Sequence, residues 1–239
     1  MKTIGLLGGL SWESTATYYA EINRGVRDAL GGLHSAPLVM HSFDFAAIQA
    51  LQNDAGWPQA GRLLAEAGAG LQKAGADCLL ICSNLMHRVA PAIEAECAVP
   101  LLHIADALGA ALQAGHAKKP LLLATRPVME ERFYADRLHE KFGIEAMVPA
   151  AEDRVELDRI IFSELVRGII NPASKEIYQA VVRKGRAAGA DSVAFACTEI
   201  GLLLTPDDCD CAVYDTAKLH ARAAVAFALG QNPVAKRLS

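Results

Sequence analysis

The sequence lacks the features that mark membrane-embedded, nucleic-acid-binding or exported proteins. No apolar stretch is long enough to span a bilayer, and the Lys and Arg residues form no basic run. The formal net charge is −4, which gives no reason to expect a nucleic acid as partner. The first residues lead directly into a strand-like run and do not resemble a signal peptide. We therefore expect a cytoplasmic protein with neither a membrane nor a nucleic acid as its partner.

Motifs for metals and covalent cofactors are also missing. The six cysteines form no paired CxxC framework, so we expect free thiols. The group nearest to a metal motif, residues 209–211 (CDC), falls in a predicted surface turn. No lysine has a setting typical of a Schiff base. We expect a protein that needs no cofactor.

A glycine-rich segment near the start of the chain only partly matches a dinucleotide fingerprint. Gly5, Gly8 and Gly9 are present, but residues 10–12 (LSW) stand where a third glycine is required. We expect instead that Gly8 and Gly9 let backbone amides approach a carboxylate at the start of the next helix.

Apolar runs of strand length alternate with alanine-rich stretches of helical length. Hydrophobic residues make up 52% of the chain and charged residues 21%, which suits a substantial core. The predicted strands are residues 4–7, 38–42, 78–82, 99–103, 120–124, 144–148, 192–196 and 212–214. The predicted helices are residues 13–30, 58–74, 86–97, 105–114, 129–142, 152–168, 173–188 and 216–229. Nearly continuous apolar strands separated by helices predict an α/β fold with parallel sheets flanked by helices.

The phrase AGAD occurs twice, at residues 74–77 and 188–191, and each copy precedes an apolar run. The offset of 114 residues places Ser83 opposite Cys197. A fixed offset of this size predicts two similar lobes related by a pseudo-two-fold, with an active-site cleft between them. We expect the first lobe to combine residues 1–100 with 213–239, and the second to span residues 101–212. Two side chains facing such a cleft could approach one substrate carbon from opposite faces.

Ser83 and Cys197 each follow a predicted strand, at the edge where ligands of open α/β sheets bind. Cys197 precedes Thr198 and Glu199 at a predicted helix start, and a helix N-terminus lowers the pKa of a thiol. Taken alone, Cys197 would be interpreted as a packed core thiol and Ser83 as a helix cap. Their equivalence in the repeat favours catalytic roles. Glu199 is interpreted as a helix-start charge. His87 could orient a neighbouring group or cap its helix, but as a lone histidine it is interpreted as a structural residue.

Several segments spread from residue 1 to about residue 230 resemble the aspartate/glutamate racemase family of cofactor-independent amino-acid racemases. The resemblance implies two α/β lobes with the site in the cleft between them, and two bases, one from each lobe. Carried over by position, these bases are Ser83 and Cys197. The segments that carry the resemblance are residues 1–15 (MKTIGLLGGLSWEST), 31–36 (GGLHSA), 83–87 (SNLMH), 103–106 (HIAD) and 197–201 (CTEIG).

The resemblance also implies which residues contact a substrate. Asn84 and Thr198 would hold the α-carboxylate or the amine. Gln52 is the candidate for a distal carboxylate, and Thr125 would line the wall of the second lobe. The implied substrate-binding residues are Gly8, Gly9, Leu10, Gln52, Asn84, Leu85, Thr125, Val128, Thr198 and Glu199.

Three positions depart from the usual pattern of the family. The first base is Ser83 where Cys is usual, although some relatives carry Thr there. Leu85 and Val128 both stand where the family usually has Thr. Since each hydrogen bond to a charged carboxylate contributes about 1.5–3 kcal/mol, these two changes would weaken the binding of a dicarboxylate.

The sequence is therefore interpreted as a cofactor-independent racemase or epimerase of an acidic or related α-amino acid. Cys197, as a thiolate, would take the α-proton from the L enantiomer, and Ser83 would deliver a proton to the other face. Two alternatives stay open: a decarboxylase or isomerase of the same fold that uses a single Cys, and a non-catalytic protein that binds an amino acid or carboxylate. Whether the protein is a homodimer also stays open.

Overall fold

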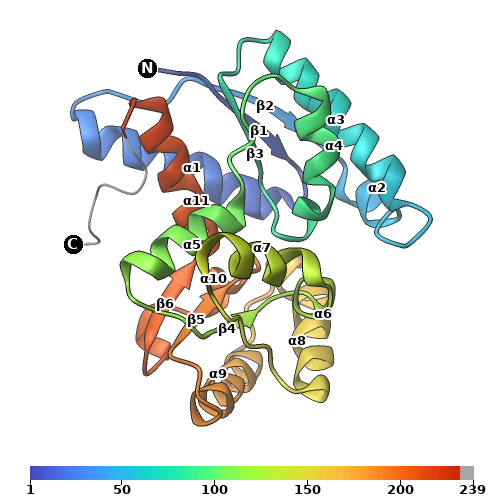
Figure 1. Cartoon of the computed structure of the whole chain (residues 1–239), viewed down its shortest axis with the longest axis vertical. Coiled ribbons are helices and arrows are strands. Elements are labelled where there is room, and N and C mark those ends of the chain that lie inside the picture. Colours follow the sequence, from blue (N-terminus) through green and yellow to red (C-terminus); the bar gives the residue numbers. More distant parts are fainter. Residues whose placement is uncertain (232–239) are drawn as a thin grey trace. The chain divides into compact units, whose positions relative to one another are not determined.

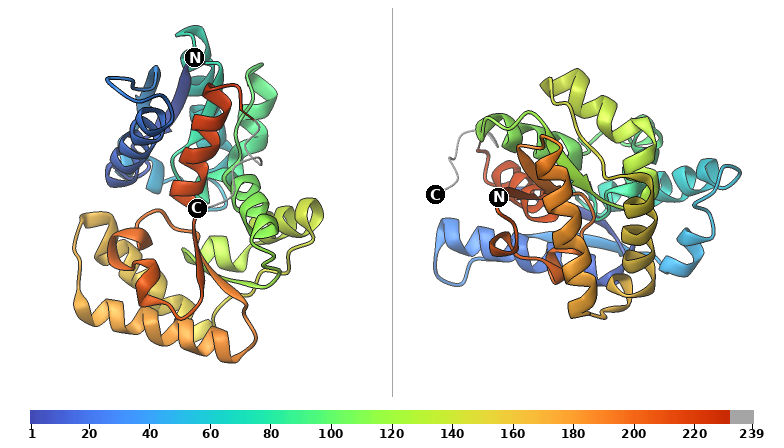
Figure 2. Two further views of the ribbon diagram at one scale, coloured as in Figure 1. Left: turned by 90° about the vertical axis from the view of Figure 1, so that its left-hand side faces the viewer. Right: turned by 90° about the horizontal axis from the view of Figure 1, so that it is seen from below.

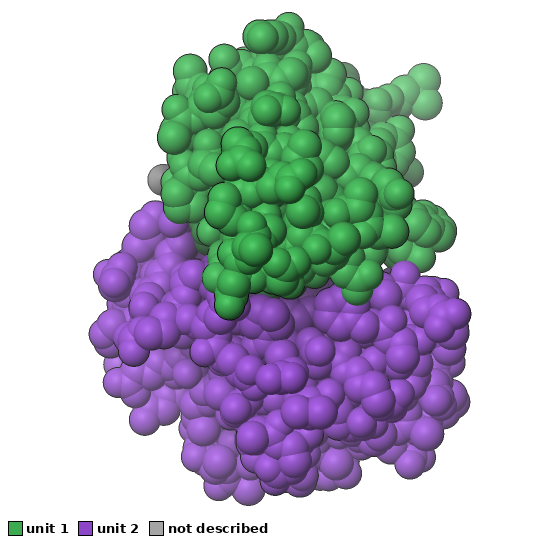
Figure 3. All heavy atoms as spheres, turned by 90° about the vertical axis from the view of Figure 1, so that its right-hand side faces the viewer, with its two compact units in different colours: residues 1–104, 220–239 green, residues 105–219 purple. Residues whose placement is uncertain are grey.

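The computed structural model describes residues 1–231 and divides the chain into two compact units (Figure 1 and Figure 3). One unit combines residues 1–104 with the chain from residue 220 onward, and the other comprises residues 105–219. Each unit contains its own parallel sheet. Within the described part of the chain, no helix has the length and apolar character that crossing a membrane requires.

The first unit is a parallel sheet with helices on both faces. In spatial order, its strands are β2 (Leu38–Ser42), β1 (Ile4–Gly8) and β3 (Cys78–Ile81). Leu101 adds an isolated parallel bridge to Leu79 of β3. Helices α1 and α11 lie side by side on one face, and α3 and α4 lie on the other (Figure 1 and Figure 2). The helices are α1 (Trp12–Leu30), α2 (Phe45–Gln49), α3 (Trp57–Lys73), the 3-10 helix η1 (Leu85–Val89), α4 (Ala90–Glu96) and α11 (Thr216–Ala228).

The second unit repeats this plan. In spatial order, its strands are β4 (Pro120–Leu123), β5 (Ser192–Phe195) and β6 (Ala212–Asp215). Met147 adds an isolated parallel bridge to Leu121 of β4. One core cluster joins β4 and β5 to several helices through buried residues such as Ile160, Val182 and Ile200. The helices are α5 (Ile104–Ala114), α6 (Arg126–Glu130), α7 (Arg132–Phe142), α8 (Ala151–Ser163), η2 (Leu165–Arg167), α9 (Pro172–Ala187), α10 (Ile200–Leu203) and η3 (Pro206–Asp208).

The two units have the same strand order once the two bridge residues are included. Numbered along the chain within each unit, the four segments lie across the sheet in the order second, first, third, fourth. In the first unit this order is β2, β1, β3 and Leu101, and in the second it is Met147, β4, β5 and β6. Leu101 takes the place in the first unit that β6 takes in the second, and Met147 takes the place of β2. The predicted α/β class, with two similar lobes built on parallel sheets, is confirmed.

The AGAD phrase forms the same helix-ending turn in both units. Gly75 follows α3 with φ of 95°, and Gly189 follows α9 with φ of 103°. These are left-handed conformations, which glycine adopts without the steric cost of a Cβ atom. The amides of Ala76 and Ala190 each donate, at 3.0 Å, to a carbonyl in the last turn of the preceding helix. The backbone therefore turns in the same way into β3 in the first unit and into β5 in the second.

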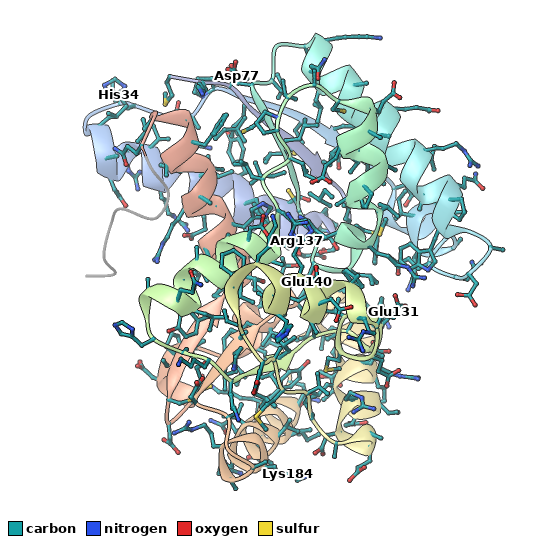
Figure 4. All side chains as sticks on the ribbon, in the orientation of Figure 1. His34, Asp77, Glu131, Arg137, Glu140 and Lys184 are labelled. Atoms are coloured by element: carbon teal, nitrogen blue, oxygen red, sulfur yellow. The ribbon has the colours of Figure 1, made fainter. Side chains whose placement is uncertain are left out.

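The aspartate of each phrase then holds the start of the neighbouring first strand. The carboxylate of Asp77, labelled in Figure 4, accepts a hydrogen bond from the amide of Thr3 at 2.7 Å. The carboxylate of Asp191 accepts hydrogen bonds from the amides of Lys118 and Lys119 at 2.6 and 2.8 Å. The repeated phrase is thus a device that joins the beginnings of two adjacent parallel strands.

The structure differs from the sequence prediction at several boundaries. Predicted strands 99–103 and 144–148 are reduced to single bridges, and the short helices α2 and α10 were not predicted. We placed the return to the first lobe at residue 213, but β6 pairs with β5 and the first unit resumes at His220. An apolar run shows that a strand forms, but not which sheet it joins. Residues 232–239, also assigned to the first lobe, lie outside the described residues.

Replacement of Asp191 by alanine should destabilise the second unit, because two backbone amides lose their acceptor. We expect the free energy of unfolding to fall by about 1 kcal/mol at about pH 7, since water partly replaces an exposed acceptor. Burial alone would raise the pKa of Asp191, but hydrogen bonds from Lys118, Ser192 and Lys119 hold this pKa below its usual value. The stabilisation is therefore complete above the unfolded pKa and is lost as the pH falls through the lower native pKa.

Thermal unfolding of Asp191→Ala and the unmodified protein, from about pH 7 to about pH 2, measures this effect. The difference in Tm should shrink as the pH falls. Asp136→Ala is the matched control, because its partner Arg132 is 86% exposed and such a pair contributes little. Equal Tm values for the Asp191 variant and the unmodified protein near neutral pH would contradict the role assigned to the carboxylate.

Candidate active site

Cys197 and Glu199 form a buried thiol–carboxylate pair after β5. Cys197 is 7% exposed and Glu199 is 4% exposed. The Sγ of Cys197 donates to Oε2 of Glu199 at 3.0 Å, and the hydroxyl of Thr198 donates to the same oxygen at 2.8 Å. The carboxylate thus collects two hydrogen bonds from the two residues before it. A carboxylate held in this way is placed to accept the thiol proton.

The surroundings of Cys197 favour the neutral thiol. Burial raises the pKa of Cys197 well above its usual value, and the negative charge of Glu199 raises it further. Our prediction that a helix N-terminus lowers this pKa is wrong. The helix α10 begins only at Ile200 and has four residues, so its dipole is small, while the adjacent carboxylate is a full negative charge. Loss of the thiol proton therefore requires a nearby acceptor.

Ser83 lies at the corresponding place after β3. It is half-buried, and its Oγ accepts a long hydrogen bond, 3.5 Å, from the amide of Met86. Its carbonyl accepts a hydrogen bond from Nδ1 of His87 at 2.7 Å. The preceding residue, Cys82, is fully buried, which raises its pKa and suits a packing role. His87 therefore contacts the backbone of Ser83 and not its hydroxyl.

The glycines after β1 are explained by close packing. A Cβ on Gly8 would lie 2.5 Å from a methyl group of Thr15. Gly9 has φ of 71°, and a Cβ there would lie 2.4 Å from the amide nitrogen of Phe43. The Gly9 amide, which we expected to approach a carboxylate, donates instead to Oγ1 of Thr15 at 2.8 Å. In this structure the Gly9 amide stabilises the first turn of α1.

The remaining predicted residues of the first unit lie at the carboxyl edge of its sheet. Leu10 and Leu85 are buried, and so is Asn84, which is 3% exposed at the start of η1. Gln52 donates from Nε2 to the sulfur of Met86 at 3.5 Å, which brings it beside the Ser83 turn. The parallel pairing of β1 with β3 places the Gly8 loop and the Ser83 turn next to each other.

In the second unit, the parallel pairing of β4 with β5 places Thr125 and Cys197 at one edge. Thr125 is 7% exposed, and its hydroxyl has no hydrogen-bond partner among the described residues. Val128 is buried in α6. A buried hydroxyl without a partner is uncommon, because burial removes the water that would otherwise satisfy it. The Thr125 hydroxyl therefore has an unused hydrogen bond to give.

Sequence reasoning did not single out Glu13, in the first turn of α1. Its Oε2 is buried and has no hydrogen-bond partner among the described residues. The signal in the sequence was an acidic residue four positions after Gly9, at the start of the first predicted helix. Across residues 1–231, no three His, Cys, Asp or Glu side chains are grouped so that they could hold a metal ion.

Comparisons with known proteins place this arrangement in a family. A protein proposed to be an Asp/Glu racemase from Yersinia pestis is 46% identical, with a TM-score of 0.89 over 96% of this chain and 100% of the other. An aspartate racemase homologue from Pyrococcus horikoshii is 32% identical, with a TM-score of 0.83 over 96% of this chain and 100% of the other. An aspartate racemase from Picrophilus torridus shares the fold at 18% identity, with a TM-score of 0.78 over 97% and 96% of the two chains.

The fold defines an α/β protein with two similar sheet units, each with polar side chains at the carboxyl edge of its strands. The Asp/Glu/Hydantoin racemase family model matches residues 7–224. The chain belongs to the Asp/Glu/hydantoin racemase family, and the resemblance found in the sequence is confirmed.

Replacement of Glu199 by glutamine should lower the pKa of Cys197, because it removes a negative charge and keeps the shape of the side chain. Each unit by which the pKa falls raises the thiolate fraction about tenfold. We expect iodoacetamide to alkylate Cys197 several-fold faster near pH 8, as followed by mass spectrometry of the Cys197 peptide. Glu130→Gln, a surface carboxylate of the same unit, should leave this rate unchanged. A slower or equal rate in Glu199→Gln would contradict the charge effect.

Proposed function

We propose that this protein is a cofactor-independent racemase or epimerase of an acidic or related α-amino acid, with Ser83 and Cys197 as its two bases. Membership of the Asp/Glu/hydantoin racemase family supports this class of reaction. The observation that carries the proposal is the buried pair of Cys197 and Glu199, whose sulfur and oxygen lie 3.0 Å apart. A thiol beside a buried proton acceptor acts as an acid, and after losing its proton it acts as a base at carbon.

Glu199 supplies the acceptor that Cys197 needs. Transfer of the thiol proton to Oε2 of Glu199 leaves a thiolate and a neutral carboxyl, so the net charge of the pair does not change. The thiolate then takes the α-proton of the L enantiomer. The electron pair of the broken C–H bond moves into the substrate carboxylate and gives an enediolate-like intermediate.

Ser83 acts on the opposite face of the α-carbon. Its hydroxyl delivers a proton, and the new C–H bond forms from the electron pair of the intermediate. The neutral carboxyl of Glu199 then releases its proton to solvent and the serine oxygen takes one from solvent, so that both groups return to their starting protonation states. His87 is not a base for this hydroxyl, because its Nδ1 donates to the Ser83 carbonyl and its Nε2 accepts from the Ile104 amide. Ser83 is therefore the weaker base. The α-proton consequently exchanges with solvent faster on the Cys197 face of the α-carbon than on the Ser83 face.

Hydroxyls and backbone amides hold the substrate carboxylate in this proposal. Thr125 has a buried hydroxyl with a hydrogen bond to give, and we assign it to the substrate. The backbone amides of the turn at Ser83 and Asn84 stabilise the developing negative charge. Asn84 and Thr198 contact the α-carboxylate or the amine, and Gln52 contacts the distal group.

A second candidate is a decarboxylase or isomerase that uses Cys197 alone. Two observations favour it: a hydroxyl stands at position 83, and Leu85 and Val128 are buried apolar side chains where the family usually carries threonine. Both candidates need the thiol. They differ in whether the α-proton of an amino acid exchanges with solvent.

Proton exchange in D₂O, followed by NMR, separates these readings. For L- and D-aspartate and glutamate, we expect the α-proton of the L enantiomer to wash out faster than racemisation proceeds, because Cys197 can return a solvent proton to the same face. Ser83→Ala should abolish racemisation and keep part of the L-side washout. Cys197→Ala should lower both by about a thousandfold or more, since a proton-transfer group is lost.

Cys82→Ala is the matched control, because Cys82 is a fully buried neighbouring thiol. It should keep the ratio of washout to racemisation. Equal washout from both enantiomers would show that Ser83 is an effective base and that the proposed asymmetry is wrong. Absence of exchange from every amino acid tested would overturn the racemase proposal.

A threonine at position 85 should restore a hydroxyl to the carboxylate site. We expect Leu85→Thr to lower the KM for aspartate or glutamate by about tenfold with little change in kcat, because the added bond acts on bound substrate and transition state alike. Leu85→Val is the matched control, since valine has the shape of threonine without the hydroxyl. Equal KM values in the two variants would show that the residue at position 85 does not contact a carboxylate.

A further inference from the structure

Three histidines from separate parts of the first unit lie together beneath the Ser83 turn. His87, His103 and His220 are 2%, 5% and 0% exposed. The ring centres of His87 and His103 lie 4.4 Å apart, and those of His87 and His220 lie 5.6 Å apart. Of these three histidines, His87 is the one whose ring is hydrogen-bonded to the backbone of the proposed base Ser83 in the interactions described above.

The two ring nitrogens of His87 have different roles that fix its tautomer. Nδ1 lies 2.7 Å from the carbonyl oxygen of Ser83, and since a carbonyl can only accept, Nδ1 carries the proton. Nε2 lies 3.2 Å from the amide nitrogen of Ile104, and since an amide N–H can only donate, Nε2 is the acceptor. A protonated ring would lose this acceptor. His87 is therefore held as the neutral Nδ1–H tautomer.

His87 binds both residues of the turn that carries the proposed base. Its ring donates to the carbonyl of Ser83, and its own backbone amide donates to the carbonyl of Asn84 at 3.1 Å. Through Nε2, it also joins this turn to the amide of Ile104, at the start of α5. Among the described residues, the hydroxyl of Ser83 has one hydrogen bond, the long one from the amide of Met86, so its position depends on the backbone of the turn.

The other rings fix the surface against which His87 packs. Nε2 of His220 donates to the carbonyl of Leu102 at 2.6 Å, so Nδ1 of the neutral ring accepts from the hydroxyl of Tyr18 at 2.8 Å. The Tyr18 and His220 rings meet edge to face at 5.5 Å. His103, before α5, and His220, in α11, thus pack against the His87 ring, and Tyr18 of α1 is hydrogen-bonded to His220.

We propose that His87 is a positioning residue for Ser83: its Nδ1–H bond to the Ser83 carbonyl fixes the turn that aims the Ser83 hydroxyl at the substrate. This inference rests on the proposed two-base function and adds to it a residue that positions only one of the two bases, Ser83. Cys197 lies in the other unit and has its own partner in Glu199. Loss of the His87 bond should therefore impair proton delivery at one face.

Two variants separate the two hydrogen bonds of the ring. In His87→Asn, the side-chain amide nitrogen stands close to the place of Nδ1 and can still donate to Ser83. In His87→Gln, the terminal oxygen stands close to the place of Nε2 and can still accept from Ile104. We expect His87→Gln to slow racemisation by about tenfold, as a misplaced group does, while L-side washout in D₂O changes little. His87→Asn should keep the ratio of racemisation to washout near that of the unmodified protein.

Tyr18→Phe is the matched control, because it removes a buried hydroxyl from the same cluster without touching the Ser83 turn. It should lower Tm and leave the ratio unchanged, since general destabilisation reduces both processes together. An unchanged ratio in His87→Gln, or the same fall in both His87 variants, would overturn the positioning role. If His87→Gln does not fold, His87→Asn decides: a preserved ratio supports the role, and a lowered ratio overturns it. Absence of washout and racemisation in the unmodified protein would overturn the two-base function and this role with it.

Discussion

The carboxylates of Asp77 and Asp191 fix the register of the strands that lead to Ser83 in one unit and to Cys197 in the other. Each aspartate ends a glycine-containing turn and binds the backbone at the start of the neighbouring strand. Because side chains alternate along a strand, a slip of one residue would turn every side chain to the opposite face. Correct register at the start of the strands fixes which residues emerge at their carboxyl ends. Ser83 and Cys197 occupy equivalent places because the same turn sets both registers.

The side chains at the two equivalent places, Ser83 and Cys197, have different hydrogen-bond partners. Cys197 lies beside a buried carboxylate that accepts its hydrogen bond, and burial together with this charge raises the pKa of the thiol. Ser83 has no such partner at its hydroxyl in the interactions described, and the nearby His87 is bound to its carbonyl. Two similar sheets thus carry, at equivalent places, a thiol paired with a carboxylate in one unit and a hydroxyl with a long hydrogen bond in the other. We infer that the sheets set where the groups stand, whereas their immediate neighbours set how readily each gives up a proton.

Much of the fold could be predicted from sequence because it depends on local patterns. The predicted strand 38–42 coincides with β2, and the predicted helix 13–30 differs from α1 by one residue at its start. These predictions succeed because the spacing of apolar residues and the length of an apolar run are local properties of the sequence. The failures have physical reasons as well. The run 99–103 is apolar, yet it forms a single bridge, because Pro100 has no backbone N–H to donate and α5 begins at Ile104. The assignment of β6 failed because sheet membership is a long-range choice.

The sequence by itself determined the α/β class, the duplication and the family, because these follow from periodicity, from a repeated phrase and from motifs spread over the chain. Only the tertiary structure decided the protonation chemistry. The pKa of Cys197 depends on burial and on the carboxylate of Glu199, and the sequence suggested the opposite direction. The tautomer of His87 depends in part on the amide of Ile104, seventeen residues away, because that amide can only donate to Nε2. Electrostatic effects depend on distance in space and on exclusion of water, and folding sets both.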